Sequence, residues 1–345
     1  LKAIPASTIR QIEVITEPGA KYDAEGTSAV LNIITSSSSL IKGATGMLSS
    51  SINNNATNRN SAYAATSIGK TTVSANYAYT QFPTKESESS THSSVLYGNG
   101  QVLDMQRLSQ SRGNAHYLNI AASCDIDSLN LLSFSAGGYF LSYKTNSMSS
   151  YNRYDDLNDL LYSYDENNHN PRNQYNTCNL RMDYQHKTRK PGDVFTFSYM
   201  LNGTQNKAVN NVVYSNRFNM PMDYTAYSRH VKNNNIEHTI QFDYATKVDK
   251  HNTLDLGLKY IYRLSKNTTE QDYSSKVTTM SSFFNHSTNI AASYVEWNAQ
   301  YWKWNFRPGI RYEFSRLKGF YPKGIGNTYS CSLNDFVPSV NILYK

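Results

Sequence analysis

Residues 151–170 gather acidic side chains among tyrosines and asparagines, and this stretch could do chemistry. Closely spaced carboxylates could hold a cation or contact a substrate, and tyrosine rings could stack on sugars or other flat ligands. The spacing does not match an EF-hand loop, which needs acids at alternate positions and a glycine. A solvated acidic loop is the simpler alternative. The candidate substrate contacts are Tyr154, Asp155, Asp156, Asp159, Tyr162 and Tyr164, with Asp165 and Glu166 beside them.

Catalytic and metal-binding patterns are missing from the sequence. No GxSxG element accompanies the many serines, and the histidines are scattered over the chain. The three cysteines lie far apart without CxxC or Cys/His spacing, so they predict neither a disulfide framework nor a zinc site. We therefore expect no enzymatic activity, no metal and no cofactor.

Charge excludes a further class of partner. The formal net charge is +7, but lysines and arginines are spread along the chain. No basic stripe with interleaved aromatic residues occurs, so we expect no nucleic-acid partner.

Alternation with period two dominates the rest of the chain. In residues 254–263 leucines and tyrosines alternate with Asp255, Gly257, Lys259, Ile261 and Arg263, and residues 305–314 repeat the pattern of an apolar and a largely polar face. Such a strand has one apolar face and one wet face. The runs reach about a dozen residues, and the apolar faces end in tyrosines, of which the chain has 28. This favours a membrane β-barrel wall, with a soluble β protein as the alternative.

Hydropathy is consistent with that interpretation. Mean hydropathy is −0.59, and no run approaches the roughly eighteen apolar residues of a membrane helix. A helical membrane protein is therefore excluded. A β-barrel is compatible with this value because half of each strand is polar.

Turn residues divide the chain into hairpins. Gly, Pro, Asp and Asn predict tight turns at 69–70, 125–130, 190–193, 249–252 and 301–303. Between them we expect long polar connections at 83–114, 144–171, 208–235, 267–287 and 316–332. The predicted strands are 43–54, 59–68, 71–82, 115–126, 129–143, 173–188, 193–207, 236–248, 253–266, 287–300, 302–315 and 333–344. Short turns at one end and long loops at the other are typical of outer-membrane barrels.

Residues 1–42 have a different pattern. A short strand at 9–15 is followed by a Pro/Gly turn, an acidic segment at 22–28 and a second strand at 29–35. A unit this small cannot bury much apolar surface alone, so it must pack against another part of the protein. We expect one domain at 1–42 and a second at 43–345.

The N-terminal segment carries a specific resemblance. IPASTIRQIEVITEPGAKYDAEGTSAVLNIIT resembles the end of the plug domain of TonB-dependent outer-membrane receptors, in the form common in Bacteroidetes-type bacteria. The resemblance implies an all-β, antiparallel transmembrane β-barrel with a plug remnant at its N-terminus. Family barrels have 22 strands around a plugged lumen, and about a dozen are predicted here. The chain also lacks an initiator Met, a signal peptide, the earlier plug residues and the TonB-contacting box. We therefore expect a mature or excised piece.

The same resemblance implies a function. A family member in the bacterial outer membrane imports a siderophore, glycan, peptide or vitamin. Its partners would be outer-membrane lipid, an inner-membrane TonB complex that binds a segment outside this sequence and, in some systems, a surface lipoprotein. The alternative is a passive pore or surface adhesin without energised transport.

Opposite charges suggest how the expected plug would be held. Carboxylates of residues 1–42 could pair with cations on the wet face of the barrel strands, each pair kept weak by water. Ordinary solvated charge is the alternative. The candidate contacts are Glu13, Glu17, Lys21, Asp23 and Glu25 on the first segment, and Arg181, Lys259, Arg263, Arg307 and Arg311 on the strands.

Overall fold

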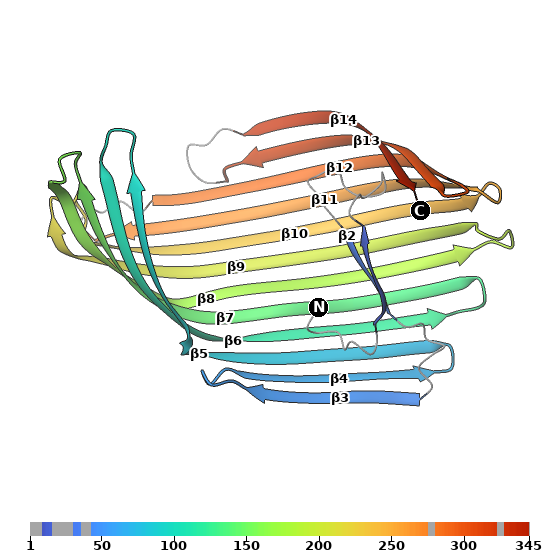
Figure 1. The fold of residues 1–345 in the computed structure, drawn as a ribbon, viewed down its shortest axis with the longest axis horizontal. Helices are drawn as coiled ribbons and strands as arrows, with labels where there is room; N and C mark the ends of the chain where they lie inside the picture. The colour runs from blue at the N-terminus through green and yellow to red at the C-terminus, as the bar shows by residue number, and fades with distance from the viewer. Residues whose placement is uncertain (1–8, 16–29, 36–42, 275–279, 323–327, 345) are drawn as a thin grey trace.

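A computed structural model describes residues 9–15, 30–35, 43–274, 280–322 and 328–344. These residues form β-strands joined by turns (Figure 1). In the part of the chain that the structure describes, no helix is long and apolar enough to cross a membrane. The strands are β1 (Ile9–Ile15), β2 (Val30–Thr35), β3 (Gly43–Ile52), β4 (Asn58–Ile68), β5 (Thr71–Leu96), β6 (Val102–Asp125), β7 (Asn130–Tyr154), β8 (Leu160–Lys187), β9 (Val194–Phe218), β10 (Ala226–Lys247), β11 (Asn252–Tyr273), β12 (Met280–Tyr301), β13 (Trp304–Phe320) and β14 (Tyr329–Tyr344).

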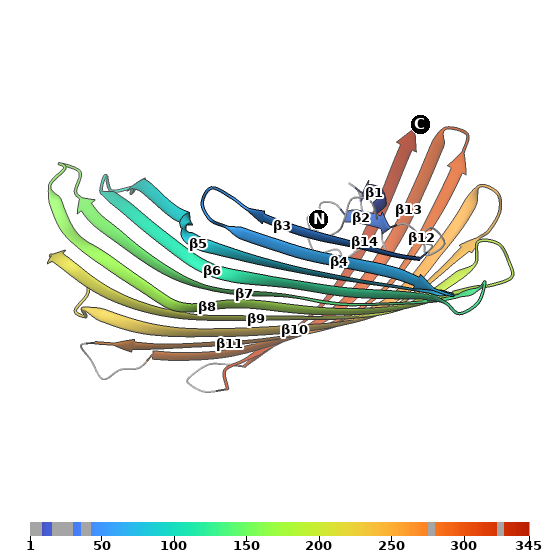
Figure 2. The same cartoon turned by 90° about the horizontal axis from the view of Figure 1, so that it is seen from below.

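The predicted antiparallel all-β fold is confirmed. Strands β3 to β14 form one 12-stranded sheet in which each strand pairs with its neighbours in sequence, and β3 and β14 are its edges. Strands β1 and β2 form a separate antiparallel pair, with Glu13 opposite Asn32. Figure 2 shows that the large sheet is curved and that the β1–β2 pair lies on its concave side. That these strands are part of a 22-stranded barrel stays a prediction.

The long loops predicted from the sequence are wrong. Strands β5 to β12 run for 22 to 28 residues, so most of 83–114, 144–171, 208–235 and 267–287 is paired strand. These stretches are rich in Ser, Asn and Thr on both faces and therefore lack hydrophobic alternation. Backbone hydrogen bonds nevertheless continue the ladder, as between Ser149 and Glu166. A strand that is wet on both faces carries no periodic signal.

The two faces of the sheet differ as the alternation predicts. On the outer, convex face large apolar side chains are exposed, among them Leu258 at 61% and Phe336 at 70%. On β11 this apolar band runs from Leu254 to Tyr262, a length close to the ~9–11 residues of a membrane-crossing strand. The inner, concave face is polar, yet Arg311 is only 1% exposed there.

An aromatic row marks one limit of the apolar band. The Tyr199 hydroxyl lies 3.0 Å from His238 Nδ1, and the His238 and Tyr262 rings are 6.3 Å apart. His238 is directly opposite Tyr262 on β11, and Tyr199 lies on the same face two residues along β9 from Leu201, the residue opposite His238. Tyrosine suits such a boundary, because its ring is apolar and its hydroxyl binds water. Beyond Tyr262, β11 continues to Tyr273, which extends the hairpins well past the apolar band.

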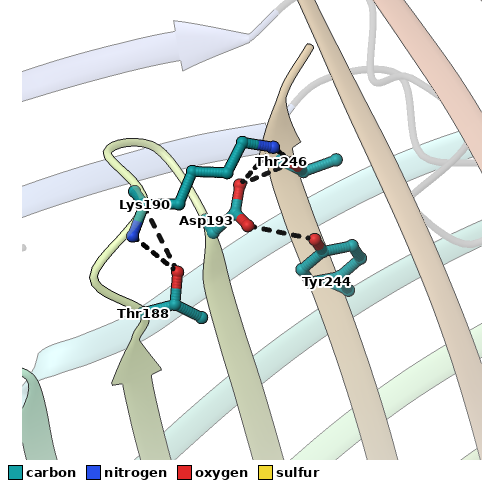
Figure 3. Close-up of polar contacts among 5 residues, drawn as sticks. All are labelled: Thr188, Lys190, Asp193, Tyr244 and Thr246. Carbon is teal, nitrogen blue, oxygen red and sulfur yellow. Dashed lines mark hydrogen bonds and ion pairs between the residues drawn. The ribbon is translucent and has the colours of Figure 1, made fainter.

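Tight turns join the strands at the opposite end of the apolar band. In the β8–β9 turn the Thr246 hydroxyl donates to Asp193 Oδ1 at 2.5 Å and the Tyr244 hydroxyl to Oδ2 at 3.3 Å (Figure 3). Lys190 Nζ lies 3.4 Å from the same carboxylate. Asp193 thus ties its own turn to β10. All five predicted tight turns are confirmed. Because the hairpins extend well past the apolar band at the opposite end, we expect the end with these turns to be periplasmic.

We predict that Asp193→Ala lowers the urea midpoint of unfolding in lipid vesicles at pH 7. The hydrogen bond from Thr246, followed by those from Lys190 and Tyr244, lowers the pKa of Asp193. A carboxyl with a depressed folded-state pKa stabilises the fold above its unfolded value of about 4 and loses that effect as the pH falls further. The midpoint difference between wild type and variant should therefore shrink between pH 4 and pH 2. Lys250→Ala, in the neighbouring turn, is the control and should leave the midpoint unchanged.

Candidate functional site

The inner face of β8 to β13 carries a wall of interleaved charges, which we call the charged wall. Cross-strand pairing aligns its members in rows, one of which runs from Asp183 through Ser198 and Gln241 to Lys259 and Glu313. The charged wall comprises Arg181, Asp183, Glu237, Asp243, Lys259, Arg263, Glu296, Arg307, Arg311 and Glu313.

Three arginines of the charged wall pair with carboxylates of the wall itself. Arg311 Nη2 lies 2.5 Å from Glu313 Oε1, and both side chains are buried. Arg263 Nε donates to Glu237 at 2.6 Å, and Arg307 Nε donates to Glu296 at 3.1 Å. Burial demands such pairing for Arg311, Glu313 and Glu296, because an isolated buried charge costs several kcal/mol.

Arg181 has a similar but more open contact. Its Nε donates to Asp183 Oδ2 at 2.7 Å, while the Ser198 hydroxyl donates to the other carboxylate oxygen at 2.6 Å. The Arg181 side chain is 56% exposed. Exposed pairs of this kind contribute about 0–1 kcal/mol, so water or another anion competes easily with them.

A glycine allows one long contact across the charged wall. Asp243, Gly257 and Tyr294 are aligned on β10, β11 and β12, and the Tyr294 hydroxyl donates to Asp243. The Tyr294 ring lies over Gly257, where an added Cβ would meet ring carbon Cε1 at 2.3 Å. Only a glycine at position 257 leaves room for the Tyr294 ring to pass over β11 and reach Asp243 on β10.

The structure describes only some of the residues that the sequence predicts to join plug and barrel. All five predicted cations lie on the inner face, with Lys259 between Gln241 and Ala292 in its row. Glu13 lies on β1. The other four candidates, Glu17, Lys21, Asp23 and Glu25, lie outside the described residues. The pairing between the two groups stays a prediction.

The charged wall borders a recess on the inner face. Its volume is about 780 Å³, and it is lined by residues of β9 to β14, including Glu237, Arg263, His286, Glu313 and Asp335. Among the described residues, no three His, Cys, Asp or Glu side chains are grouped closely enough to hold a metal ion. The charged and polar side chains that line the recess can form salt bridges and hydrogen bonds with a bound group.

A second group lies on the same inner face, but on the hairpin extensions beyond the apolar band. The Tyr151 and Tyr164 rings are stacked with centroids 4.8 Å apart, and Tyr164 meets Tyr214 edge-on at 5.5 Å. The contacts continue from Tyr214 across β10 to β11. This tyrosine cluster comprises Tyr151, Tyr162, Tyr164, Tyr214, Tyr224, Tyr227 and Tyr273.

Charged groups lie within the tyrosine cluster. Burial raises the pKa of Glu166 above the usual range of a glutamate, although Arg107, Arg229 and a hydrogen bond from Tyr214 act in the opposite direction. Burial and the neighbouring tyrosines also raise the pKa of Tyr164 to about 12. The tyrosine hydroxyls are therefore neutral hydrogen-bond donors and acceptors at physiological pH.

The predicted substrate residues occupy two different places. Tyr162 and Tyr164 belong to the tyrosine cluster, whereas Tyr154 ends β7. Asp155 forms a turn, because its Oδ1 accepts from the backbone N–H groups of Leu157 at 3.0 Å and Asp159 at 2.8 Å. Asp156 and Asp159 are exposed in the same turn. The structure therefore separates the acids from the rings that follow them.

Several members of the tyrosine cluster, and the two arginines near Glu166, were not predicted. They come from expected loops, and nothing in the sequence alone relates them: Tyr214, Tyr224, Tyr227, Tyr273, Arg107 and Arg229. Their proximity depends on strand register, which pairs Arg107 with Ser149, Ser149 with Glu166, and Glu166 with Tyr214. The tyrosine cluster could have been predicted only if residues 144–171 had been recognised as paired strands.

Comparison with known proteins gives one informative match. Residues 186–345 match the model of the outer membrane protein beta-barrel family. A comparison with curated proteins gives no match.

Solved structures give only distant likenesses. The outer membrane protease OmpT from Escherichia coli has 10% identity and a TM-score of 0.25, covering 86% of this chain and 98% of its own. The hemophore receptor HasR of Serratia marcescens, solved as a double mutant with its hemophore HasA and heme, has 12% identity and a TM-score of 0.24, covering 96% and 66%. The FrpB iron transporter from Neisseria meningitidis has 6% identity and a TM-score of 0.22, covering 95% and 83%.

We predict that Arg311→Met destabilises the protein by about 3–5 kcal/mol in guanidinium unfolding from phospholipid vesicles, because it leaves the Glu313 carboxylate buried without its cation. The double variant Arg311→Met/Glu313→Leu should recover most of that loss. Arg181→Met is the control at an exposed pair, and its cost should stay below about 1 kcal/mol. An Arg311→Met cost as small as that of Arg181→Met would contradict the importance of burial here.

Proposed function

We propose, from the premise that this chain is a β-barrel protein of the bacterial outer membrane, that it is a TonB-dependent receptor that imports a nutrient. In this proposal residues 1–42 are the end of a plug, residues 43–345 belong to the barrel, and the hairpin extensions receive the substrate on the cell surface. The proposal assigns no catalytic step to the chain.

The observation that carries the proposal is the position of the β1–β2 pair. These strands have the sequence that resembles the end of a plug, and they lie on the concave side of the sheet (Figure 2). They also directly precede β3, the first strand of the wall. A barrel used as an open pore has no need of a folded segment on its inner side.

The chemistry of the charged wall supports a displaceable plug. A guanidinium has five N–H donors, more than one carboxylate accepts, so Arg181 can hold Asp183 and still bind a plug carboxylate. Each such contact in a wet lumen is worth about 0–1 kcal/mol. Several weak contacts would hold the plug, and a pull from the periplasm could break them one at a time.

Two expected partners follow from this proposal. The inner-membrane TonB complex would supply the pull, and a surface lipoprotein could deliver or retain substrate at the hairpin extensions. Lipid would contact the exposed apolar side chains of the outer face.

We predict that growth supported by this protein depends on TonB. Cells that carry or lack the gene would be grown on single sources of iron, carbon or vitamin: haem, ferric siderophores, oligosaccharides, peptides and cobalamin. At least one source should support growth only when both the gene and a functional TonB complex are present. If gene-dependent growth persists after TonB is disrupted, the protein is a passive pore. If the gene changes cell adhesion but does not support growth on any of these sources, the protein is an adhesin.

We also predict that the first segment blocks conductance. In planar lipid bilayers the purified full-length protein should give no stable open channel. A variant lacking all residues up to Lys42 should conduct, because the lumen is then unfilled. The matched control is Glu13→Gln, which removes one charge and keeps β1. Equal, steady conductance by the full-length protein and the deletion variant would refute a plug role for residues 1–42.

A further inference from the structure

We propose that the tyrosine cluster and the polar side chains beneath it bind a saccharide. This inference deepens the proposed function by naming the class of imported substrate. It depends on the inner face of the hairpin extensions of β7 to β11, a surface distinct from the charged wall.

Unsatisfied polar atoms provide the first observation. Within the described part of the chain, four buried side-chain atoms of β8 and β10, on the face that carries the tyrosine cluster, lack a hydrogen-bond partner: Asn168 Oδ1, Asn170 Oδ1, Asn173 Nδ2 and Arg229 Nε. Asn173 as a whole is only 6% exposed. A buried polar atom without a partner costs about 1–3 kcal/mol, so each such group in a native protein needs an explanation, such as strain, a functional role or a bound water or ion.

A β-bulge brings these atoms together. Asn170 pairs with Thr145 and Asn173 with Tyr143, so between these pairs two residues of β8 face one residue of β7. The pairing of β8 with β9 shifts at the same place, between His169 and Arg172. Regular alternation would send Asn170 and Asn173 to opposite faces, whereas the bulge turns both inward. Bulges of this kind often re-aim a side chain at a binding site.

The register also gives the size of this polar floor, defined as Asn168, Asn170, Asn173 and Arg229. Residues 168 to 173 span about 17 Å along β8, and β10 lies about 10 Å from β8 across the sheet. Glu166 and Tyr214 border the floor at one end, and Tyr227 borders it on β10, opposite Val212. The floor is therefore large enough for an extended ligand with several polar groups.

The ligand must offer both donors and acceptors. Asparagine carbonyl oxygens need donors, whereas Arg229 Nε and the Asn173 amide need acceptors. A hydroxyl group serves both needs, and it does so whichever way an asparagine amide is turned. A molecule with many hydroxyls therefore matches all four atoms, which a purely anionic or purely cationic ligand does not.

The tyrosine rings favour a saccharide among such molecules. Sugar rings have apolar C–H faces, and a group of tyrosine rings such as the stacked Tyr151 and Tyr164 offers aromatic surface for contact with them. The four floor atoms are buried, so a ligand reaches them only after neighbouring side chains move. A peptide usually binds by adding a strand to an open edge, but β7 to β10 are each paired on both sides.

Binding tests this inference without any transport step. The full-length protein in detergent micelles would be titrated calorimetrically with neutral and uronic-acid oligosaccharides of four to seven units. Polyethylene glycol of equal length, which has ether acceptors but no hydroxyl donors, is the ligand control, together with a random tetrapeptide library. We expect at least one saccharide to bind and polyethylene glycol not to bind. No saccharide binding, or binding of the peptides alone, would overturn the inference.

Variants locate the site. Asn168→Leu and Arg229→Lys should each weaken saccharide binding about tenfold, the effect of one lost hydrogen bond of about 1.4 kcal/mol. Asn167→Leu is the matched control, because this neighbouring amide bonds Ser215 and lies on the opposite face. Folding of each variant is checked by heat-modifiable gel mobility. Equal affinity for Asn168→Leu, Arg229→Lys and Asn167→Leu would place the saccharide elsewhere and overturn the inference.

The outcomes separate this inference from import. Saccharide binding that depends on Asn168 and Arg229, with TonB-independent growth, would support the site and refute energised transport. TonB-dependent growth on haem or a siderophore, with no saccharide bound, would support import and refute this substrate class.

Discussion

The continuous backbone ladder from β3 to β14 is the constraint on which the rest of the structure depends. A strand that crosses hydrocarbon must satisfy every backbone N–H and C=O inside the protein, and lateral pairing is how strands do so. Pairing then fixes register, and register fixes which side chains face lipid and which face the interior. The charged wall, the Tyr199–His238–Tyr262 row and the tyrosine cluster are all consequences of the same register.

Within that ladder the inner face changes character along the strands. At the level of the apolar band it holds paired charges, with Arg311 and Glu313 fully enclosed and Arg181 open to water. Past the band it holds tyrosines, serines and asparagines around Glu166. The first environment suits a contact that forms and breaks, whereas the second suits recognition of an uncharged, polar molecule. A receptor that binds outside and moves an inner element needs both.

Local departures from regular pairing give this inner face its particular shape. Gly257 lets the Tyr294 ring cross a strand to reach Asp243, and the bulge at β8 turns Asn170 and Asn173 to one side. Neither feature is needed to keep the sheet together. Gly257 costs backbone order and the bulge leaves a residue unpaired. Their presence on the inner face, where no lipid packs, is what a binding surface would require.

The sequence by itself determined the class of fold, the strands within the apolar band and the tight turns. Alternation such as that of Leu256, Leu258 and Tyr260 against Asp255 and Lys259 has one physical solution, a strand between an apolar and a wet surface. The cations of the charged wall could also be predicted to face inward, by the same parity. The length of the hairpins could not, because residues such as Ser147, Ser149 and Asn168 are polar without a period. Only the tertiary structure decided that these strands continue, and only pairing between strands far apart in sequence brings Arg107, Glu166 and Arg229 to one surface.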